Sequence, residues 1–229
     1  MTGDEVVAFA LALADDELVI GHRHSEWLGL SPFLEEDLAT ASIAQDEMGH
    51  ARAIYAVLWP DRSNRDALVT LRPPGEWRCC ALVEADARPW ERHLVRHLVY
   101  DIVEGHRWSA LATRDPDAFG ALAARAAQEE GWHRRHATGL TGRLAVDHSP
   151  RLQAQLDDLW PMVGDLVSGM TESERNHALD DLVATLDQVG LNAPATTPVP
   201  GDRTTRSAAF ADVHQSFIEV AALDPSASW

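Results

Sequence analysis

The sequence predicts an all-α fold, a four-helix bundle with additional C-terminal helices. Apolar residues recur at helical spacing through several long segments. The motif Glu-x-x-His occurs twice within these segments, and each copy follows an acidic residue by about thirty positions, with a predicted turn halfway between. A length of 229 residues and a hydrophobic content of 45% predict one domain, residues 1–229, with a substantial core.

Composition excludes several classes of partner. Nineteen basic residues against 36 acidic ones give a formal net charge of −17, which disfavours binding to nucleic acid or to an anionic membrane. The adjacent Cys79 and Cys80 fit neither a disulfide framework nor a zinc ribbon, which indicates a reducing compartment. Neither a signal peptide nor an apolar run of membrane-spanning length is visible, so we expect a cytoplasmic protein.

The first helical hairpin is predicted over residues 4–58. Its two helices are expected from about residue 4 to 29 and from about residue 33 to 58, with Asp4 as the first N-cap. The sequence Gly29-Leu30-Ser31-Pro32 between them is typical of a turn, because proline restricts the preceding residue and suits a helix start.

The second helix of this hairpin carries Gln-Asp-Glu-Met-Gly-His at residues 45–50. Glu47 and His50 leave the same, otherwise apolar face, where a carboxylate and an imidazole are costly unless a cation binds both. Glu17 and Glu47 are 30 residues apart with their midpoint at Pro32, so they should face each other across the hairpin. Glu26 is the alternative, but it would lie about 14 Å along the axis from Glu47.

A second hairpin, residues 89–140, is predicted to repeat this design. It follows a crossover at residues 59–88, and a long crossover joins the two halves of ferritin-like bundles. Its first helix carries Asp101 and its second carries Glu130-Gly-Trp-His133, and Asp101 and Glu130 are 29 residues apart around an Asp-Pro turn. The fold class is therefore a ferritin-like bundle.

Together the hairpins supply four carboxylates and two imidazoles, the ligand set of a di-iron or di-manganese bundle. The predicted metal ligands are Glu17, Glu47, His50, Asp101, Glu130 and His133. Such a set neutralises two divalent cations and suits iron or manganese better than calcium. Glu104, one turn beyond Asp101, is a candidate additional ligand or proton carrier.

Residues 149–229 are expected to form C-terminal helices and a loop. Helices are predicted from about residue 149 to 168, from 172 to 190 and from 208 to 223, with a proline-containing loop at 193–205. Four further histidines are expected to be exposed or at the edge of the core rather than ligands: His22, His24, His106 and His136.

These residues resemble the ferritin-like subunits of bacterial phenylacetyl-coenzyme A epoxidase. Over most of its length the chain is most similar to the structural, non-catalytic subunit. The matching segments are Asp-Asp-Glu-Leu-Val-Ile-Gly, Ser25-Glu26-Trp27, Leu34-Glu35-Glu36-Asp37-Leu38-Ala39, Gly49-His50-Ala51-Arg52, Leu191-Asn192-Ala193-Pro194 and Trp229.

The metal motifs instead resemble those of the catalytic subunit of that family. Apolar or amide residues characteristically stand at the positions of Glu47 and His50 in the structural subunit. Here, residues 45–50 and 129–133 are similar to the catalytic motifs, as is Asp101. The first ligand of the catalytic subunit lies in a His-Ser-Glu triplet, which would select Glu26 rather than Glu17 here.

The resemblance implies a non-haem di-iron oxygenase that epoxidises or hydroxylates an aromatic acyl-CoA or a related substrate with dioxygen. In this interpretation Glu47 and Glu130 bridge two iron ions, with manganese as the alternative metal, and form the catalytic centre. A separate reductase and a second ferritin-like subunit, or self-association, are the implied partners. The alternatives are a non-catalytic structural subunit with a vestigial metal site, and a ferroxidase or iron-handling protein.

Overall fold

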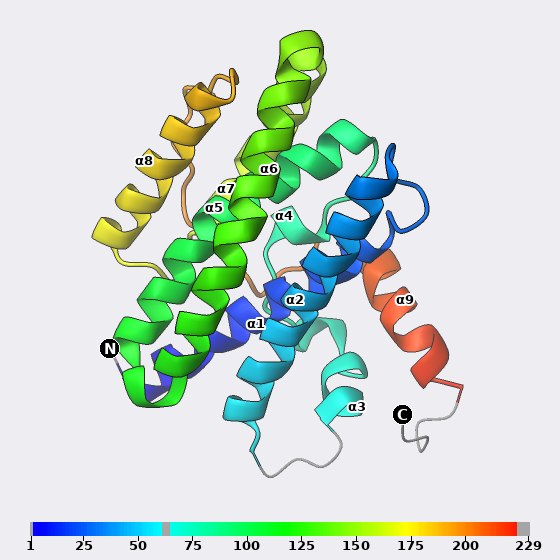
Figure 1. Ribbon diagram of the computed structural model, residues 1–229. Helices are drawn as coiled ribbons and strands as arrows, with labels where there is room; N and C mark the ends of the chain where they lie inside the picture. Colours follow the sequence, from blue (N-terminus) through cyan, green and yellow to red (C-terminus); the bar gives the residue numbers. More distant parts are fainter. Residues whose placement is uncertain (1, 61–64, 224–229) are drawn as a thin grey trace.

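Four long helices form the centre of the protein. The computed structural model describes residues 2–60 and 65–223, so Trp229 of the resemblance lies outside the described residues. The four helices are α1 (Gly3–Ser25), α2 (Leu34–Leu58), α5 (Trp90–Arg114) and α6 (Pro116–Leu159) (Figure 1). Helix α1 packs against α2 and α5 packs against α6, and contacts between α2 and α6 and between α1 and α5 join the two pairs. The predicted all-α, ferritin-like fold class is confirmed; the single-domain organisation stays a prediction.

Two glycines shape the first helical pair. Gly29 adopts a φ of +78° in the turn after α1, a conformation that favours glycine, and its backbone N–H donates to Asp37 Oδ1 at 2.7 Å. On α1, a Cβ at Gly21 would lie 3.0 Å from the carbonyl oxygen of Ala44 and 3.1 Å from Cβ of Glu47. Glycine therefore lets α1 approach α2 closely at the level of Glu47.

The N-terminus of α1 differs from the prediction. Thr2, not Asp4, is the N-cap, and it forms a capping box with Glu5, whose backbone N–H donates to the threonine hydroxyl while its carboxylate accepts from the backbone N–H of Thr2. Asp4 lies in the first turn, where its negative charge favours the helix dipole.

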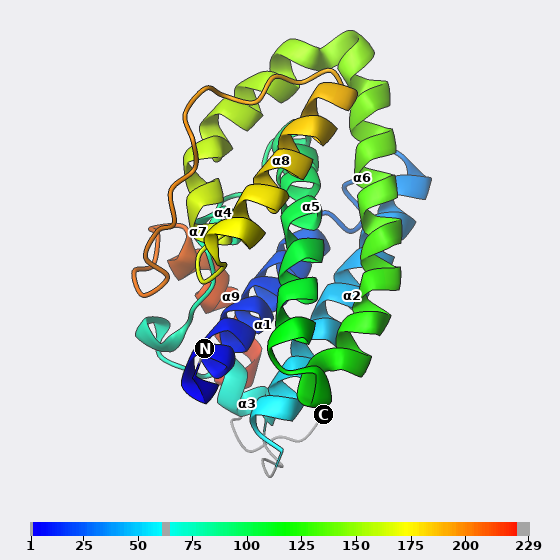
Figure 2. The same cartoon turned by 90° about the vertical axis from the view of Figure 1, so that its left-hand side faces the viewer.

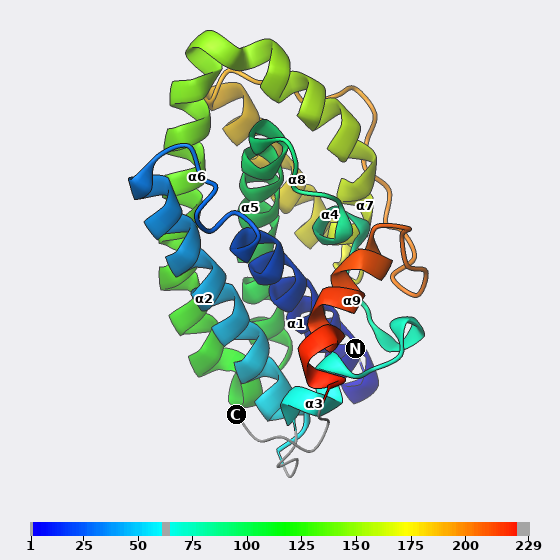
Figure 3. The same cartoon turned by 90° about the vertical axis from the view of Figure 1, so that its right-hand side faces the viewer.

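The crossover between the helical pairs contains short helical segments. These are α3 (Arg65–Thr70), a 3₁₀ turn (Pro74–Glu76) and α4 (Ala81–Glu84). Figure 3 shows them on the side of α1 opposite α6, next to the C-terminal helix α9 (Phe210–Ala221). Trp77 of the crossover is fully buried, and its ring stacks on Phe217 of α9 at 5.5 Å between centroids. The crossover and α9 thus cover the outer face of α1 together.

The prediction that one helix ends near Leu140 and another starts at residue 149 is wrong. Helix α6 continues to Leu159, and after a sharp bend at the top of the view its last turns run back down toward α7 (Figure 2). Residues 141–148 contain no proline, and Pro150 sits inside the helix, where the missing N–H and the ring produce a kink rather than a helix start. A 3₁₀ turn (Trp160–Met162) and α7 (Val163–Leu166) follow.

The C-terminal part packs on both sides of the bundle. Helix α8 (Glu172–Gln188) begins with a capping box of Thr171 and Glu174 and packs against α5. Helix α9 contacts α3, and Ser216 Oγ lies 2.6 Å from Nε2 of His22 on α1. Among the described helices, none combines the length and the apolar character that crossing a membrane requires.

Candidate metal centre

The four long helices bring five acidic and imidazole side chains into one buried group. One ligand atom of each lies within 4.8 Å of the others in the set Glu17, Glu47, His50, Glu104 and Glu130. His133 borders this group, since its Nδ1 is 3.4 Å from Oε1 of Glu130 and 3.6 Å from Oε1 of Glu47. Both Glu-x-x-His motifs and Glu17 therefore meet at one level of the bundle.

Helix α5 presents two carboxylates to this region. Glu104 lies inside the group, whereas the predicted ligand Asp101, one turn earlier, lies against His97, with 2.8 Å between Oδ2 and Nε2. Glu26, the alternative to Glu17, lies at the C-terminal end of α1 and forms an ion pair with Arg23 at 2.8 Å. The structure thus brings Glu17 rather than Glu26 to the other acids, and adds Glu104.

The two histidines are held by a reciprocal pair of outer carboxylates. His50 of α2 directs Nδ1 toward Glu17, at 3.3 Å, while its Nε2 lies 2.7 Å from Oε2 of Glu129 on α6. His133 of α6 in turn has Nε2 3.3 Å from Oδ2 of Asp46 on α2. Histidines that bind metals commonly donate their second N–H to a carboxylate in this way.

Sequence reasoning missed Asp46 and Glu129, although a signal was present. In both motifs an acidic residue directly precedes the glutamate of Glu-x-x-His. It also gave no role to Trp108 of α5. The indole N–H donates to Oε1 of Glu17 at 2.9 Å and to Oε1 of Glu104 at 3.1 Å, so this tryptophan fixes both carboxylates.

The glutamates repel one another in the absence of a cation. Burial, then the charges of Glu104 and Glu47, raise the pKa of Glu17 well above its usual value. Burial, then Glu130 and Glu47, do the same to the pKa of Glu104. The pKa of Glu130 rises to about 8, mainly through burial and the charge of Glu47. Each of these acids therefore favours its neutral form at neutral pH.

Charge is concentrated instead on Glu47 and His133. Burial alone would raise the pKa of Glu47, but Glu17 and then His133 lower it to about 2. Burial would lower the pKa of His133, but its contacts with Glu130 and Glu47 raise it above the usual value. Burial raises the pKa of Asp101, which His97 only partly offsets. The imidazolium of His133 thus balances the carboxylate of Glu47.

The residues present fit a bound metal cation. Both carboxylate oxygens of Glu47 and of Glu130 accept no well-formed hydrogen bond from the described residues, although they are fully buried. No lysine or arginine of the described chain forms an ion pair with Glu17, Glu47, Glu104 or Glu130. Buried carboxylates without such partners are costly, and oxygen and imidazole donors together suit iron or manganese. The group is compatible with iron.

Comparison with known proteins assigns the family. The family described as phenylacetic acid catabolic protein matches residues 2–229. The chain belongs to this family. It is also similar to one subunit of the 1,2-phenylacetyl-CoA epoxidase of Escherichia coli (strain K12), with 28% identity over 211 residues that cover 83% of this chain and 85% of that relative. The resemblance found in the sequence is confirmed at the level of the family.

This member of the phenylacetic acid catabolic protein family has a cavity beside the acidic group. The cavity has a volume of about 320 Å³ and lies among α5, α6 and α8. Asp101 and Glu130 line it together with small residues, among them Gly105, Ala127 and Gly131. Arg134 lies at its wall and donates two hydrogen bonds to Asp181, both 2.7 Å long. The cavity thus lies between the acidic group and Asp181 of α8.

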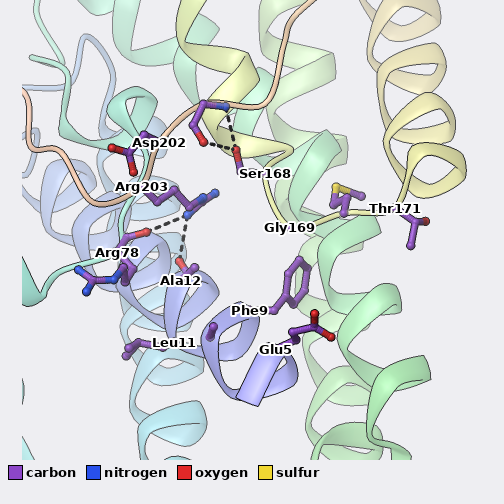
Figure 4. Close-up of a pocket in the computed structure, with 13 residues that line it drawn as sticks. Glu5, Phe9, Leu11, Ala12, Arg78, Ser168, Gly169, Thr171, Asp202 and Arg203 are labelled. Atoms are coloured by element: carbon purple, nitrogen blue, oxygen red, sulfur yellow. Dashed lines mark hydrogen bonds between the residues drawn. The ribbon is translucent and has the colours of Figure 1, made fainter. Parts of the chain in front are cut away.

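A larger cavity lies elsewhere and does not belong to the metal centre. Its volume is about 580 Å³, and Figure 4 shows it between the first turns of α1 and the segment around Ser168, with Phe9 and Glu5 on the α1 side. Arg203 at its edge donates to the carbonyl oxygens of Ala12 and Arg78. None of the metal-centre acids lines this cavity.

The remaining histidines largely follow the prediction. His22, His106 and His136 are half-buried at the edge of the core, and His106 lies 2.9 Å from Asp181. His24 contradicts it, because its side chain is fully buried. The reason is that α5 packs over the end of α1, so that His93 and His97 lie against the ring of His24.

Proposed function

We propose that this chain is the oxygenase component of a phenylacetyl-CoA epoxidase-type complex, in which two iron ions activate dioxygen to epoxidise or hydroxylate an aromatic acyl-CoA. The observation that carries the proposal is the buried acidic group without a lysine or arginine partner among the described residues. Family membership supports the same chemistry, because the similar relative is named as an epoxidase component.

Glu47 and Glu130, which lie between the two histidines, would hold the metal ions at the middle of the group. His50 and His133 would each serve one ion, and Glu17, 3.3 Å from His50, would be a terminal carboxylate beside it. Asp101 or its neighbour Glu104 would complete the set from α5. When bound, the iron pair supplies the redox chemistry that dioxygen requires.

The chain itself would position these groups and exclude water. Trp108 holds the carboxylates of Glu17 and Glu104 through its indole N–H, and Asp46 and Glu129 orient the imidazoles through their outer nitrogens. The cavity beside Asp101 and Glu130 would admit dioxygen and the reactive end of the substrate. Preorganised ligands of this kind bind metal without further rearrangement.

An exposed apolar turn supports association with another subunit. Five apolar side chains in and after the turn between α1 and α2 have exposed fractions between 45% and 71%: Leu28, Leu30, Phe33, Leu34 and Leu38. A patch of this kind is typical of an interaction surface. We assign it to a second ferritin-like subunit or a second copy of this chain, with a separate reductase as electron donor in the cytoplasm.

A second candidate is the structural, non-catalytic subunit of such a complex. The sequence favours it, because over most of its length the chain resembles the structural subunit of the family. The two candidates differ in one measurable property, because only the oxygenase component needs a metal centre that turns over with dioxygen.

Anaerobic loading with Fe²⁺ tests the proposal. We expect two iron ions per chain, a Mössbauer spectrum of a coupled pair after oxidation, and loss of both in the Glu47→Ala variant. Addition of a reductase, dioxygen and phenylacetyl-CoA should then yield a product heavier by one oxygen atom in the mass spectrum. An iron pair without product would favour the structural subunit, and absence of iron uptake would refute the metal centre.

Parallel variants decide which carboxylate of α5 binds. If Glu104 is the ligand, Glu104→Ala should lower the iron content to one ion or less, whereas Asp101→Asn should leave two. If Asp101→Asn lowered the iron content and Glu104→Ala did not, Asp101 would be the metal ligand, as the sequence predicted.

A further inference from the structure

A second cluster of potential ligands lies outside the acidic group. His24 of α1 and His93 and His97 of α5 each offer a ring nitrogen, and these three atoms lie within 4.8 Å of one another. The ring centroid of His24 is 5.0 Å from that of His93 and 4.8 Å from that of His97. All three side chains are at most 3% exposed.

Hydrogen bonding does not explain why these histidines are buried. Within the described residues, neither ring nitrogen of His24 has a hydrogen-bond partner, and Nδ1 of His93 has none. An unsatisfied buried polar group costs about 1–3 kcal/mol. The ring of His93 stacks on Trp90, with 4.9 Å between the ring centroids. This contact stabilises the face of the imidazole ring in the core but gives its nitrogens no hydrogen-bond partner. Three imidazoles therefore converge, and two of them, His24 and His93, carry buried nitrogens that no described group of the chain binds.

The surrounding charges indicate which kind of ligand fits. Burial, then the neighbouring histidines and Arg96, lower the pKa of His24, and burial and Arg96 lower that of His93, so the positive charge of Arg96 acts on both rings. The fully buried guanidinium of Arg96 repels any cation held only by charge. Binding must therefore come from coordinate bonds to imidazole, which exclude Mg²⁺ and Ca²⁺ and suit zinc or another late transition metal.

We propose that His24, His93 and His97 form a metal site for a divalent late transition ion of the zinc type, separate from the carboxylate centre. Three imidazoles leave a fourth position of a tetrahedral ion for water or a carboxylate. Asp101, whose Oδ2 lies 2.8 Å from Nε2 of His97, supplies the negative charge on one side. Because Asp101 also borders the cavity at Glu130, this residue connects the two centres.

The site ties together elements that are distant in the sequence. His24 lies in the last turn of α1 and His93 in the first turn of α5, so a bound ion would link the first hairpin to the start of the second across the crossover. This role does not depend on the proposed oxygenase function.

The test uses the full chain after removal of metals by chelation, with Zn²⁺ and Co²⁺ as probes. The double variant Glu47→Ala/Glu130→Ala removes two carboxylates from the middle of the acidic group, and the histidine substitutions below show whether the remaining uptake depends on His24 and His93. We expect it to bind one Zn²⁺ per chain by calorimetry and to give with Co²⁺ the intense visible absorption of a four-coordinate ion. No uptake by this variant would overturn the proposal.

Substitution of the histidines completes the test. In the same background, His24→Phe and His93→Phe keep an aromatic ring in the core, and each should weaken Zn²⁺ binding by more than about 100-fold, since even outer partners of a ligand contribute 10–100-fold. His148→Ala, at an exposed histidine of α6, is the control and should not change binding. Unchanged affinity in both phenylalanine variants, with circular dichroism equal to the parent, would show that Zn²⁺ binds elsewhere.

Discussion

Three consecutive acids of α1 enter two different environments. Asp15, Asp16 and Glu17 all have fully buried side chains, so burial alone does not distinguish them. Asp15 and Asp16 face the side of α1 that the crossover and the C-terminal loop cover, and both are paired with arginine. Glu17 faces α2 and α5, and its neighbours there are other acids.

The negative charges of Asp15 and Asp16 are neutralised by other groups of the chain. Asp16 accepts hydrogen bonds from Arg107 at 2.5 Å, from Arg203 at 2.7 Å and from the backbone N–H of Cys80 at 2.6 Å. Although burial would raise its pKa, the arginines hold the pKa of Asp16 below the usual value. Asp15 similarly accepts from Arg72 and from the Tyr55 hydroxyl. These contacts fasten the crossover and the C-terminal loop to α1.

The two environments differ in whether the chain itself provides a positive charge beside a buried carboxylate. Where a carboxylate only holds segments together, the sequence supplies arginine at the right place. At the level of Glu17 it supplies further carboxylates, and burial, followed by their mutual repulsion, raises the pKa of Glu17, Glu104 and Glu130. Such an arrangement is unfavourable without an external cation, which is the physical basis for the proposed metal centre.

The largest effect that tests this contrast is on stability. Asp16→Asn leaves Arg107 and Arg203 buried without their anion and should lower the free energy of unfolding by about 3–5 kcal/mol. Glu104→Gln, an equivalent exchange in the acidic group, should leave the metal-free protein unchanged or more stable. Urea denaturation of the chelated variants at pH 7 measures both values. Equal destabilisation by the two substitutions would contradict the distinction.

The helical bundle and most of its centre could be predicted because their signals are local. Helical periodicity and the motif Glu-x-x-His place Glu47, His50, Glu130 and His133 without knowledge of the fold. Counting outward from Pro32 also brought Glu17 opposite Glu47, since antiparallel helices keep residues equidistant from a turn at similar heights.

The other residues of the acidic group and its surroundings depend on how the helices pack, which the spacing of residues in the sequence does not specify. Asp101 and Glu104 share one face of α5, and counting from a turn fixes height only to about one helical turn of 5.4 Å. The choice between them follows from how α5 packs on α1, where Trp108 binds Glu104 together with Glu17. The contacts of Asp46 and Glu129 arise only when α2 meets α6.

The metal-free protein should lose stability as pH rises. Glu130 has a pKa of about 8 in the folded protein and 4.5 in the unfolded chain. Between these two pH values the folded protein still holds a proton on Glu130 that the unfolded chain has released. This difference stabilises the folded state at low pH, and the stabilisation is lost as pH rises to 8. The raised pKa values of Glu17, Glu104 and His133 act in the same direction. Asp16, with a lowered pKa, acts only in acid, where its contribution is lost as pH falls.

We therefore expect Glu130 alone to lower the free energy of unfolding of the chelated protein by about 3.5 kcal/mol between pH 5 and pH 8, at 1.36 kcal/mol for each unit of pKa difference. Urea midpoints at unit steps of pH measure the slope. In the Glu130→Gln variant the slope should decrease, because the titrating carboxyl is absent. A stability that rises over this range would mean that the glutamates are ionised and stabilised by groups of the chain itself.

The smallest effect on stability concerns Asp46 and Glu129, which are neither paired with a buried arginine nor part of the buried acidic group. Asp46 and Glu129 are part-exposed and contact the outer nitrogens of His133 and His50, and Glu129 also accepts a hydrogen bond from the exposed Arg125 on its own helix. Asp46→Asn and Glu129→Gln should therefore leave the unfolding free energy of the metal-free protein nearly unchanged, yet lower the affinity for Fe²⁺ by about 10–100-fold each, because the imidazoles lose their orientation.

Anaerobic competition with a coloured iron chelator measures this affinity, and Asp147→Asn, at an exposed position of α6, serves as the control. If Asp46→Asn and Glu129→Gln changed stability but not metal affinity, the two residues would be ordinary partners of buried histidines. If the two substitutions lowered metal affinity but not stability, the contacts of Asp46 with His133 and of Glu129 with His50 would serve the metal centre. A hydrogen bond with only a structural role would affect the stability of the metal-free protein instead.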